Sequence, residues 1–207
     1  MRLHKEIIKS TIASISVFAI TFWIFGIEWR TLIESPLKTL DLLVLGTAFY
    51  ILFEYGYHRF LLHIEWRVPI LNGLYEGHRE HHQSFHGNNL TSRDILRHKG
   101  TVTSWNIFPI LFLIIFFAFI YIFPHPWAFP FFLSITFCFN FFYQIAHHLT
   151  HIGDNAIDRF IIQKTALGPI RQRQINNHLE GHHRKRQKNL NFFPECPADI
   201  VFGTHEK

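Results

Sequence analysis

Cysteine, methionine and charged residues are all scarce in this chain. Its 207 residues include only 2 Cys and 1 Met, and charged residues make up 17%. Because Cys138 and Cys196 are far apart and no CxxC spacing occurs, a disulfide scaffold is excluded and both thiols are expected to be inert. The HExxH motif of hydrolytic zinc sites is also absent, and Glu80 and Glu180 have the wrong spacing to supply its glutamate.

Apolar residues are abundant and gathered in long runs. Hydrophobic residues make up 48% of the chain, including 24 Phe, which is typical of a membrane protein rather than of a soluble core. A helix needs about 20 apolar residues to cross a bilayer, and four segments meet this length. The first is preceded by Arg2 and Lys5, as in a signal peptide, but its run is too long and lacks a cleavage site, so we expect it to be retained. The sequence therefore predicts an all-α integral membrane protein with spans at about 7–29, 37–62, 105–123 and 127–147.

The positions of the basic residues predict the orientation of these spans. Of the 20 Lys and Arg residues, only Arg30 and Lys38 fall on the side opposite to the termini. Because basic residues near span ends favour the cytoplasmic side, both termini and a helical cap formed by residues 64–101 and 148–207 are expected to be cytosolic. A bacterial inner membrane and the endoplasmic reticulum both fit this arrangement.

The net charge of +5 does not require a nucleic-acid partner, since no nucleic-acid reading motif accompanies the basic residues. The basic run at 184–188 fits contacts to anionic lipid headgroups, and it fits a solvated tail equally well.

Histidine is the most informative residue type. Twelve of the 16 histidines fall into four clusters. Imidazole is the commonest neutral metal ligand, and two adjacent transition-metal ions would need many imidazoles from several segments. The sequence predicts a dinuclear metal site whose first and third clusters are raised on helix extensions just outside the hydrocarbon. The four clusters are His58 and His63; His78, His81, His82 and His86; His147, His148 and His151; His178, His182 and His183.

Helical geometry predicts how each cluster aims its rings. At 100° per residue the three histidines of HREHH (78–82) share one face, and so do the first and last histidines of HHLTH (147–151). The two histidines of HRFLLH (58–63) are about 140° apart, which would suit two different ions. In HLEGHH (178–183) His178 aligns with His182, but His183 falls about 140° away. A π-bulge that absorbs the extra residue Gly181 would change this register.

These four boxes, with the tail NFFPECPADIVFGT at 191–204, resemble the fatty acid hydroxylase and sterol desaturase superfamily from about Glu54 onward. The HxxxxH spacing of the first box is closest to the fatty acid 2-hydroxylase branch. His86 and His148 stand outside the pattern and are additional candidates only. The resemblance implies ten metal ligands: His58, His63, His78, His81, His82, His147, His151, His178, His182 and His183.

The chain departs from the family pattern at two points. Gln144 stands where the family usually has an aspartate, and the fourth box is HxxxHH instead of HxxHH. Both departures bear on how the histidines are oriented. Candidate partners for the histidine N–H groups are Glu54, Tyr57, Gln144, Asp154 and Asp158.

The expected function is that of an iron-dependent monooxygenase, because the resemblance implies two iron ions and dioxygen as co-substrate. Zinc is the expected substitute in purified protein. A site at the bilayer boundary would receive the acyl chain of a fatty acid or membrane lipid. No cytochrome b5 domain fits in the chain, so electrons are expected from a separate cytochrome b5-like or ferredoxin-like protein.

Two alternatives remain open from the sequence. A desaturase, or a sterol or carotenoid hydroxylase, would use the same metals. A metal transporter or metal-binding membrane protein would predict ionisable ligands near the bilayer midplane, whereas these histidines lie at the span ends.

Overall fold

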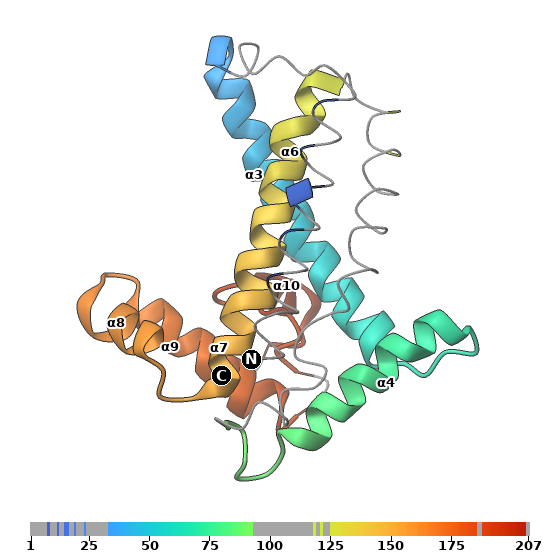
Figure 1. The fold of residues 1–207 in the computed structure, drawn as a ribbon, viewed down its shortest axis with the longest axis vertical. Helices are drawn as coiled ribbons and strands as arrows, with labels where there is room; N and C mark the ends of the chain where they lie inside the picture. Colours follow the sequence, from blue (N-terminus) through green and yellow to red (C-terminus); the bar gives the residue numbers. More distant parts are fainter. Residues whose placement is uncertain are drawn as a thin grey trace. The chain divides into compact units, whose positions relative to one another are not determined.

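A computed structural model of the chain describes residues 33–92, 125–185 and 188–205, together with isolated helical positions at 8, 12, 15, 16, 19, 23, 118 and 121 (Figure 1). Every regular element in these described ranges is a helix, as the sequence predicts. The chain divides into two compact units. One contains residues 1–50 and 103–141, and the other contains residues 51–102 and 142–207.

Two continuous helical stretches are long and apolar enough to cross a membrane. The first, Pro36–Leu62, has 27 residues, and the second, Trp127–Ile152, has 26. They coincide with the predicted spans at 37–62 and 127–147. The other two predicted spans, 7–29 and 105–123, lie outside the described ranges except for single positions. The first stretch consists of α3 (Pro36–Gly56) and η1 (Tyr57–Leu62), and the second contains most of α6 (His125–Cys138), then η3 (Phe139–Ala146) and α7 (His147–Ile152).

Small residues let α3 and α6 pack closely in the first unit (Figure 1). A side chain at Gly46 would collide with the carbonyl oxygen of Phe131 and lie 2.8 Å from Ser134 Oγ. Thr47 Oγ1 lies 3.0 Å from Ser134 Oγ, which pairs two hydroxyls in an apolar surrounding. Close approach at small residues and hydroxyl pairing are the usual means of joining helices where lipid surrounds them. At the ends of the same two helices, the ammonium of Lys38 lies 3.7 Å from the ring centre of Trp127.

The second unit holds shorter helices whose ends follow simple local rules. Proline in the first turn starts α4, α9 and α10, because its missing N–H is not needed there. Gly153 (φ 69°) and Gly203 (φ 68°) end helices in a conformation with positive φ that glycine adopts without strain. Besides η1 and α7, this unit contains α4 (Pro69–Ser84), α8 (Ala156–Lys164), α9 (Gly168–Asn176), η4 (Asn177–His182) and α10 (Pro197–Phe202).

Three segments of the described chain are π-helices, and all three lie at histidine boxes. The segment η1 covers HRFLLH, η3 directly precedes HHLTH, and η4 covers HLEGHH. In the fourth box the backbone N–H of His183 donates to the carbonyl of His178 at 3.0 Å, a bond over five residues. The predicted π-bulge at Gly181 is therefore confirmed. A side chain at Gly181 would collide with the amide of Asn189, which explains a glycine at this position.

We expect Gly46→Ala to destabilise the α3–α6 pair by about 1–3 kcal/mol, since the added methyl group overpacks a backbone contact. Gly56→Ala, in the same helix, is the matched control because a methyl group there meets nothing within 4 Å. Thermal unfolding of both variants in detergent measures the difference. Equal unfolding temperatures for the two variants would contradict the close packing at Gly46.

Candidate metal centre

The ten histidines predicted as ligands lie together in the second unit and form two groups. Within each group the ring nitrogens that could bind an ion all lie within 4.8 Å of one another. Nine of the ten side chains are buried and His63 is half-buried. The first histidine group contains His58, His63, His78, His82 and His182. The second histidine group contains His81, His147, His151, His178 and His183.

The two groups are built on the same plan. Each group takes two histidines, five residues apart, from a π-helical box and two histidines, four residues apart, from an α-helical box. A single histidine from another box completes each group. In the first histidine group the single residue is His182, which comes from the π-helical box of the other group. In the second it is His81, which comes from the α-helical box of the first. Two boxes therefore contribute histidines to both groups. The groups also adjoin each other, since the ring centres of His82 and His183 are 4.4 Å apart.

The π-helices correct two of the sequence predictions. His58 and His63 belong to the same group, not to two ions, because five residues of π-helix bring both rings to one side. In the fourth box His178 shares its group with His183, whereas His182 points to the other group. A regular α-helix would pair His178 with His182, and the π-bulge that the sequence also indicated replaces this register, because the N–H of His183 bonds to the carbonyl of His178 five positions earlier.

Backbone carbonyls fix the tautomer of four rings. A carbonyl oxygen can only accept, so a ring nitrogen bonded to it must carry the proton. Nδ1 of His151 donates to Leu90 at 3.0 Å, and Nδ1 of His183 donates to Phe85 at 2.9 Å. In the first histidine group Nδ1 of His182 donates to Lys188 at 3.2 Å, and Nδ1 of His58 donates to Leu190. In a neutral ring this leaves Nε2 as a bare lone pair, the form that binds a metal.

The Nε2 lone pairs of three of these rings face Nε2 of His78 or of His178. In the first histidine group Nε2 of His78 lies 3.0 to 3.2 Å from Nε2 of three other rings. In the second, Nε2 of His178 lies 3.0 Å from that of His151 and 3.1 Å from that of His183. One N–H cannot serve several lone pairs at once. Within the described residues, the buried Nε2 of His182 and both ring nitrogens of His81 have no hydrogen-bond partner.

This donor set fits a metal ion. Two nitrogens bound side by side at about 2.1 Å are about 3.0 Å apart around an octahedral ion and about 3.4 Å apart around a tetrahedral one. The nearest nitrogen pairs in each group are 3.0 to 3.2 Å apart, which is compatible with binding to a common ion. Five imidazoles also exceed the four ligands of a closed structural zinc site.

Burial keeps the histidines in the binding form. Removal from water, and then the neighbouring imidazoles, hold the pKa of His78, His81, His178 and His182 well below the usual value for histidine. These rings are therefore neutral at pH 7, so metal binding there releases few protons.

The two additional candidates are placed outside the groups. His148 is buried but belongs to neither group, and His86 is exposed with its Nδ1 donating to the carbonyl of Gln83.

The C-terminal segment supports the first histidine group and is itself held by two buried carboxylates, Asp199 in α10 and Glu54 in α3. Asp199 accepts from the backbone N–H of Leu190 at 2.8 Å and from that of Asn191 at 2.6 Å. Glu54 accepts from the N–H of Phe192 at 2.6 Å and from the side chain of Asn191. These bonds hold the chain whose carbonyls, at residues 188 and 190, receive the N–H groups of His182 and His58.

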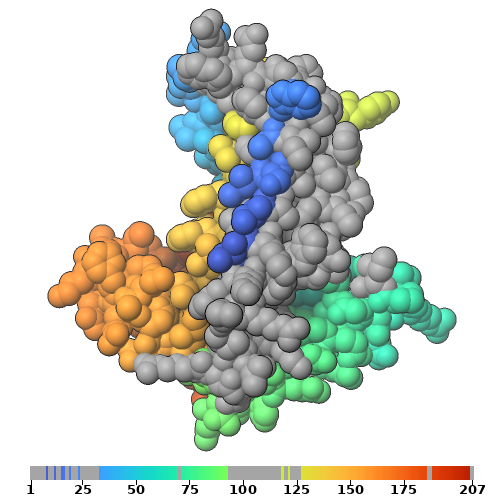
Figure 2. Space-filling model, viewed as in Figure 1, coloured from blue at the N-terminus to red at the C-terminus, as the bar shows by residue number. Residues whose placement is uncertain are grey.

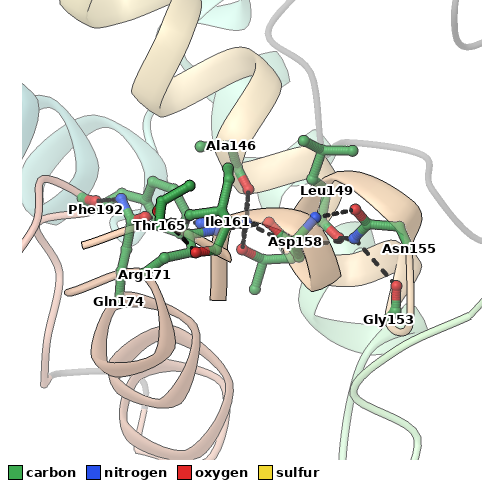
Figure 3. Close-up of polar contacts among 11 residues, drawn as sticks. Ala146, Leu149, Gly153, Asn155, Asp158, Ile161, Thr165, Arg171, Gln174 and Phe192 are labelled. Atoms are coloured by element: carbon green, nitrogen blue, oxygen red, sulfur yellow. Dashed lines mark hydrogen bonds and ion pairs between the residues drawn. The ribbon is translucent and has the colours of Figure 1, made fainter. Parts of the chain in front are cut away.

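An arginine fork supports the second histidine group (Figure 3). Arg171 is buried and binds Asp158 through two bonds, 2.8 Å from Nε and 3.1 Å from Nη2. Its Nη2 also donates at 3.0 Å to the carbonyl of Ala146 and to Oγ1 of Thr150, the residues directly before His147 and His151. A fork with several fixed N–H groups suits this role, which lysine could not fill.

The same fork reaches the fourth box through Gln174. Arg171 Nη1 donates to Gln174 Oε1 at 2.7 Å, and Gln174 Nε2 donates to the carbonyl of Phe192 at 2.7 Å. The ring of Phe192 packs edge-on against His147 and His178, at 5.1 and 4.9 Å between ring centres.

The predicted partners of the histidine N–H groups are thus corrected in part. Glu54 binds the C-terminal segment, and Asp158 binds Arg171. Among the described residues neither carboxylate bonds to an imidazole. Asp154 is exposed and lies 3.4 Å from Arg159. Tyr57 is buried beside the ring of Tyr143, and Gln144 is fully buried in η3.

Sequence reasoning missed Arg171 and Asp199. Asp199 lies within the tail that carries the resemblance, which could have marked it, but nothing in the sequence around Arg171 distinguishes it from an exposed base. The expectation of inert thiols agrees with the structure for Cys196, since burial, followed by the charge of Asp199, raises its pKa to about 12.

Comparison of the chain with known protein families, characterised proteins and solved structures finds no match.

Arg171→Met is expected to halve the metal bound per chain, because Asp158 is left unpaired and the helix carrying His147 and His151 loses its anchor. Removing one partner of a buried ion pair costs about 3–5 kcal/mol. Arg173→Met is the matched control, since Arg173 is exposed and only pairs with Glu195 at the surface. Metal analysis of the purified variants measures the effect.

A second change locates the lost ion. Adding His147→Ala to Arg171→Met should remove no more metal, whereas adding His63→Ala should remove the remainder. Equal losses in both double variants would contradict a local effect on the second histidine group.

Asp199→Asn is expected to release metal from the first histidine group, because the amide nitrogen replaces one of the two oxygens that accept from the backbone N–H groups of Leu190 and Asn191. A lost buried acceptor costs about 1–3 kcal/mol. Asp154→Asn, at an exposed carboxylate, should keep the full metal content. Metal analysis again provides the measurement, and retention of all metal by Asp199→Asn would show that the C-terminal segment does not support the site.

Proposed function

We propose that this protein is a membrane-bound dinuclear iron oxygenase that hydroxylates an acyl chain of a fatty acid or lipid. The observation that carries the proposal is the sorting of ten imidazoles into two adjoining groups of five nitrogens, with neutral rings and lone pairs turned inward. No carboxylate belongs to either group among the described residues.

The chemistry of the donor set supports a redox role. Imidazole suits iron, copper and zinc, so affinity alone does not select the metal. A hydrolytic zinc centre would need an open position beside a general base, and the glutamates within the boxes, Glu80 and Glu180, are exposed. Two iron ions, when bound, would supply the activation of dioxygen, with electrons from a separate donor protein.

The residues of the chain would then hold and shield this centre. The first histidine group would bind one ion and the second histidine group the other, and the carbonyls behind them keep each ring in the tautomer that presents Nε2. The aromatic rings of Phe85 and Phe192 pack against the second histidine group at 4.3 to 5.1 Å and exclude water from it.

The position of the boxes supports a lipid substrate. The first and third boxes lie at the ends of the two helical stretches that are able to cross a membrane, Pro36–Leu62 and Trp127–Ile152. A centre at this boundary can receive an alkyl chain from the bilayer while the polar headgroup stays in water. The distribution of basic residues supports a cytosolic location for this side of the membrane.

The test is to express the chain in an iron-replete membrane and compare extracted lipids by mass. We expect acyl chains heavier by one oxygen atom with the wild-type chain, and their loss in His82→Ala, which removes a ligand of the first histidine group. His86→Ala, at an exposed histidine outside both groups, is the control that should keep the product.

Two other results would redirect the proposal. Acyl chains with two fewer hydrogens and no added oxygen would identify a desaturase using the same centre. An identical oxygenated product from His82→Ala would show that the histidines take no part in the reaction.

A further inference from the structure

The helix α8 departs from the usual amphipathic arrangement. Its acidic residue Asp158 is buried against Arg171, whereas Ile157 and Phe160 are 53% and 62% exposed. A surface helix in water normally turns its apolar stripe inward and its charges outward. Leu167, just after the helix, is also 61% exposed.

The residues of α8 divide into three faces. At 100° per residue, Ile157, Phe160 and Ile161 share one outward stripe about 100° wide, and Arg159 and Gln163 share a separate polar face. Asp158 lies on the face that packs against the protein. The helix therefore packs one face against the protein and leaves two faces exposed, one apolar and one polar.

The turn before α8 fixes the helix at the end of a candidate membrane span. Only three residues separate Ile152, where that span ends, from Ala156, so the chain reaches at most about 14 Å. The side chain of Asn155 accepts from the N–H of Asp158 at 2.8 Å and donates to the carbonyls of Leu149 and Gly153 at 3.1 Å each (Figure 3). These bonds lock α8 to the last turn of α7.

A lipid surface is the occupant that matches these observations. The interfacial layer on each side of the hydrocarbon is several ångströms deep and lies within reach of the turn. Lys164 follows in the apolar stripe, and its long side chain can keep the ammonium among headgroups while its methylene groups lie in the apolar layer. In Figure 2 the orange segment that contains α8 forms an uncovered part of the visible surface.

We propose that α8 is an interfacial helix that inserts Ile157, Phe160 and Leu167 into the bilayer surface beside the metal centre. Because Asp158 on its inner face binds Arg171, the helix ties the second histidine group to the membrane plane. This inference rests on the membrane placement in the proposed function and adds a second, monotopic contact to it.

The test attaches an environment-sensitive fluorophore to single cysteines in the full chain, reconstituted in phosphatidylcholine vesicles. Cys138 and Cys196 are buried, so the parent chain should label poorly and serves as the blank. Cysteines replace Ile157 and Phe160 on the stripe, and Arg159 and Gln163 on the polar face as matched controls. Quenching by a spin-labelled lipid is compared with quenching by iodide in water.

We expect the lipid quencher to act several-fold more strongly than iodide at Ile157 and Phe160, and iodide to act more strongly at Arg159 and Gln163. Iodide quenching at all four positions would overturn the inference. Protection from both quenchers at the stripe would also overturn it, because a protein surface would then cover α8. If labelling at Phe160 prevents folding, Leu167 provides the same measurement.

A label at Phe137 separates this inference from the proposed function, since Phe137 is 59% exposed within the helical stretch Trp127–Ile152. Lipid quenching at Phe137 without lipid quenching at α8 would overturn the interfacial helix alone. Absence of lipid quenching at Phe137 as well would overturn the membrane placement of both.

Discussion

The arrangement of this protein depends on the confinement of imidazole lone pairs away from water. Ten rings from four chain segments gather their nitrogens in two groups, each within 4.8 Å, and nine of the ten side chains are buried. Such an arrangement is unfavourable without a cation, so folding and metal loading are expected to be coupled. The backbone geometry of the boxes serves this constraint, because π-helical turns place histidines five residues apart on one side.

The two histidine groups share a plan but have different supports. Carbonyls of the C-terminal segment, held by Glu54 and Asp199, receive the N–H groups of the first. The second depends on Arg171, whose guanidinium binds the carbonyl and hydroxyl groups beside two of its histidines. In both groups the buried carboxylates act indirectly. Glu54 and Asp199 bind backbone N–H groups, and Asp158 binds Arg171. Metal sites are commonly tuned at this distance, and oxygen ligation by these carboxylates is not needed to explain their burial.

Much of the fold and the site follows from the sequence. Apolar run lengths predict the helical stretches at 37–62 and 127–147, and histidine clustering together with the box resemblance predicts the ten residues that the structure brings into two groups. The extra residue Gly181 also signals a π-bulge. What failed was the assignment of rings to groups from α-helical angles, because the backbone of HRFLLH and of HLEGHH is π-helical.

The sequence by itself determined which residue types could bind metal and which segments could enter a membrane, since both depend on local composition and spacing. Only the tertiary structure decided which histidines lie in the same group, that Asp158 pairs with Arg171, and that Asp199 orders the chain behind His58 and His182. These choices depend on contacts between residues far apart in the chain, and periodicity along one helix carries no information about the partner that packs against it. The helix angle that sorts the rings is likewise set by such packing, because a π-turn is unfavourable until its neighbours stabilise it.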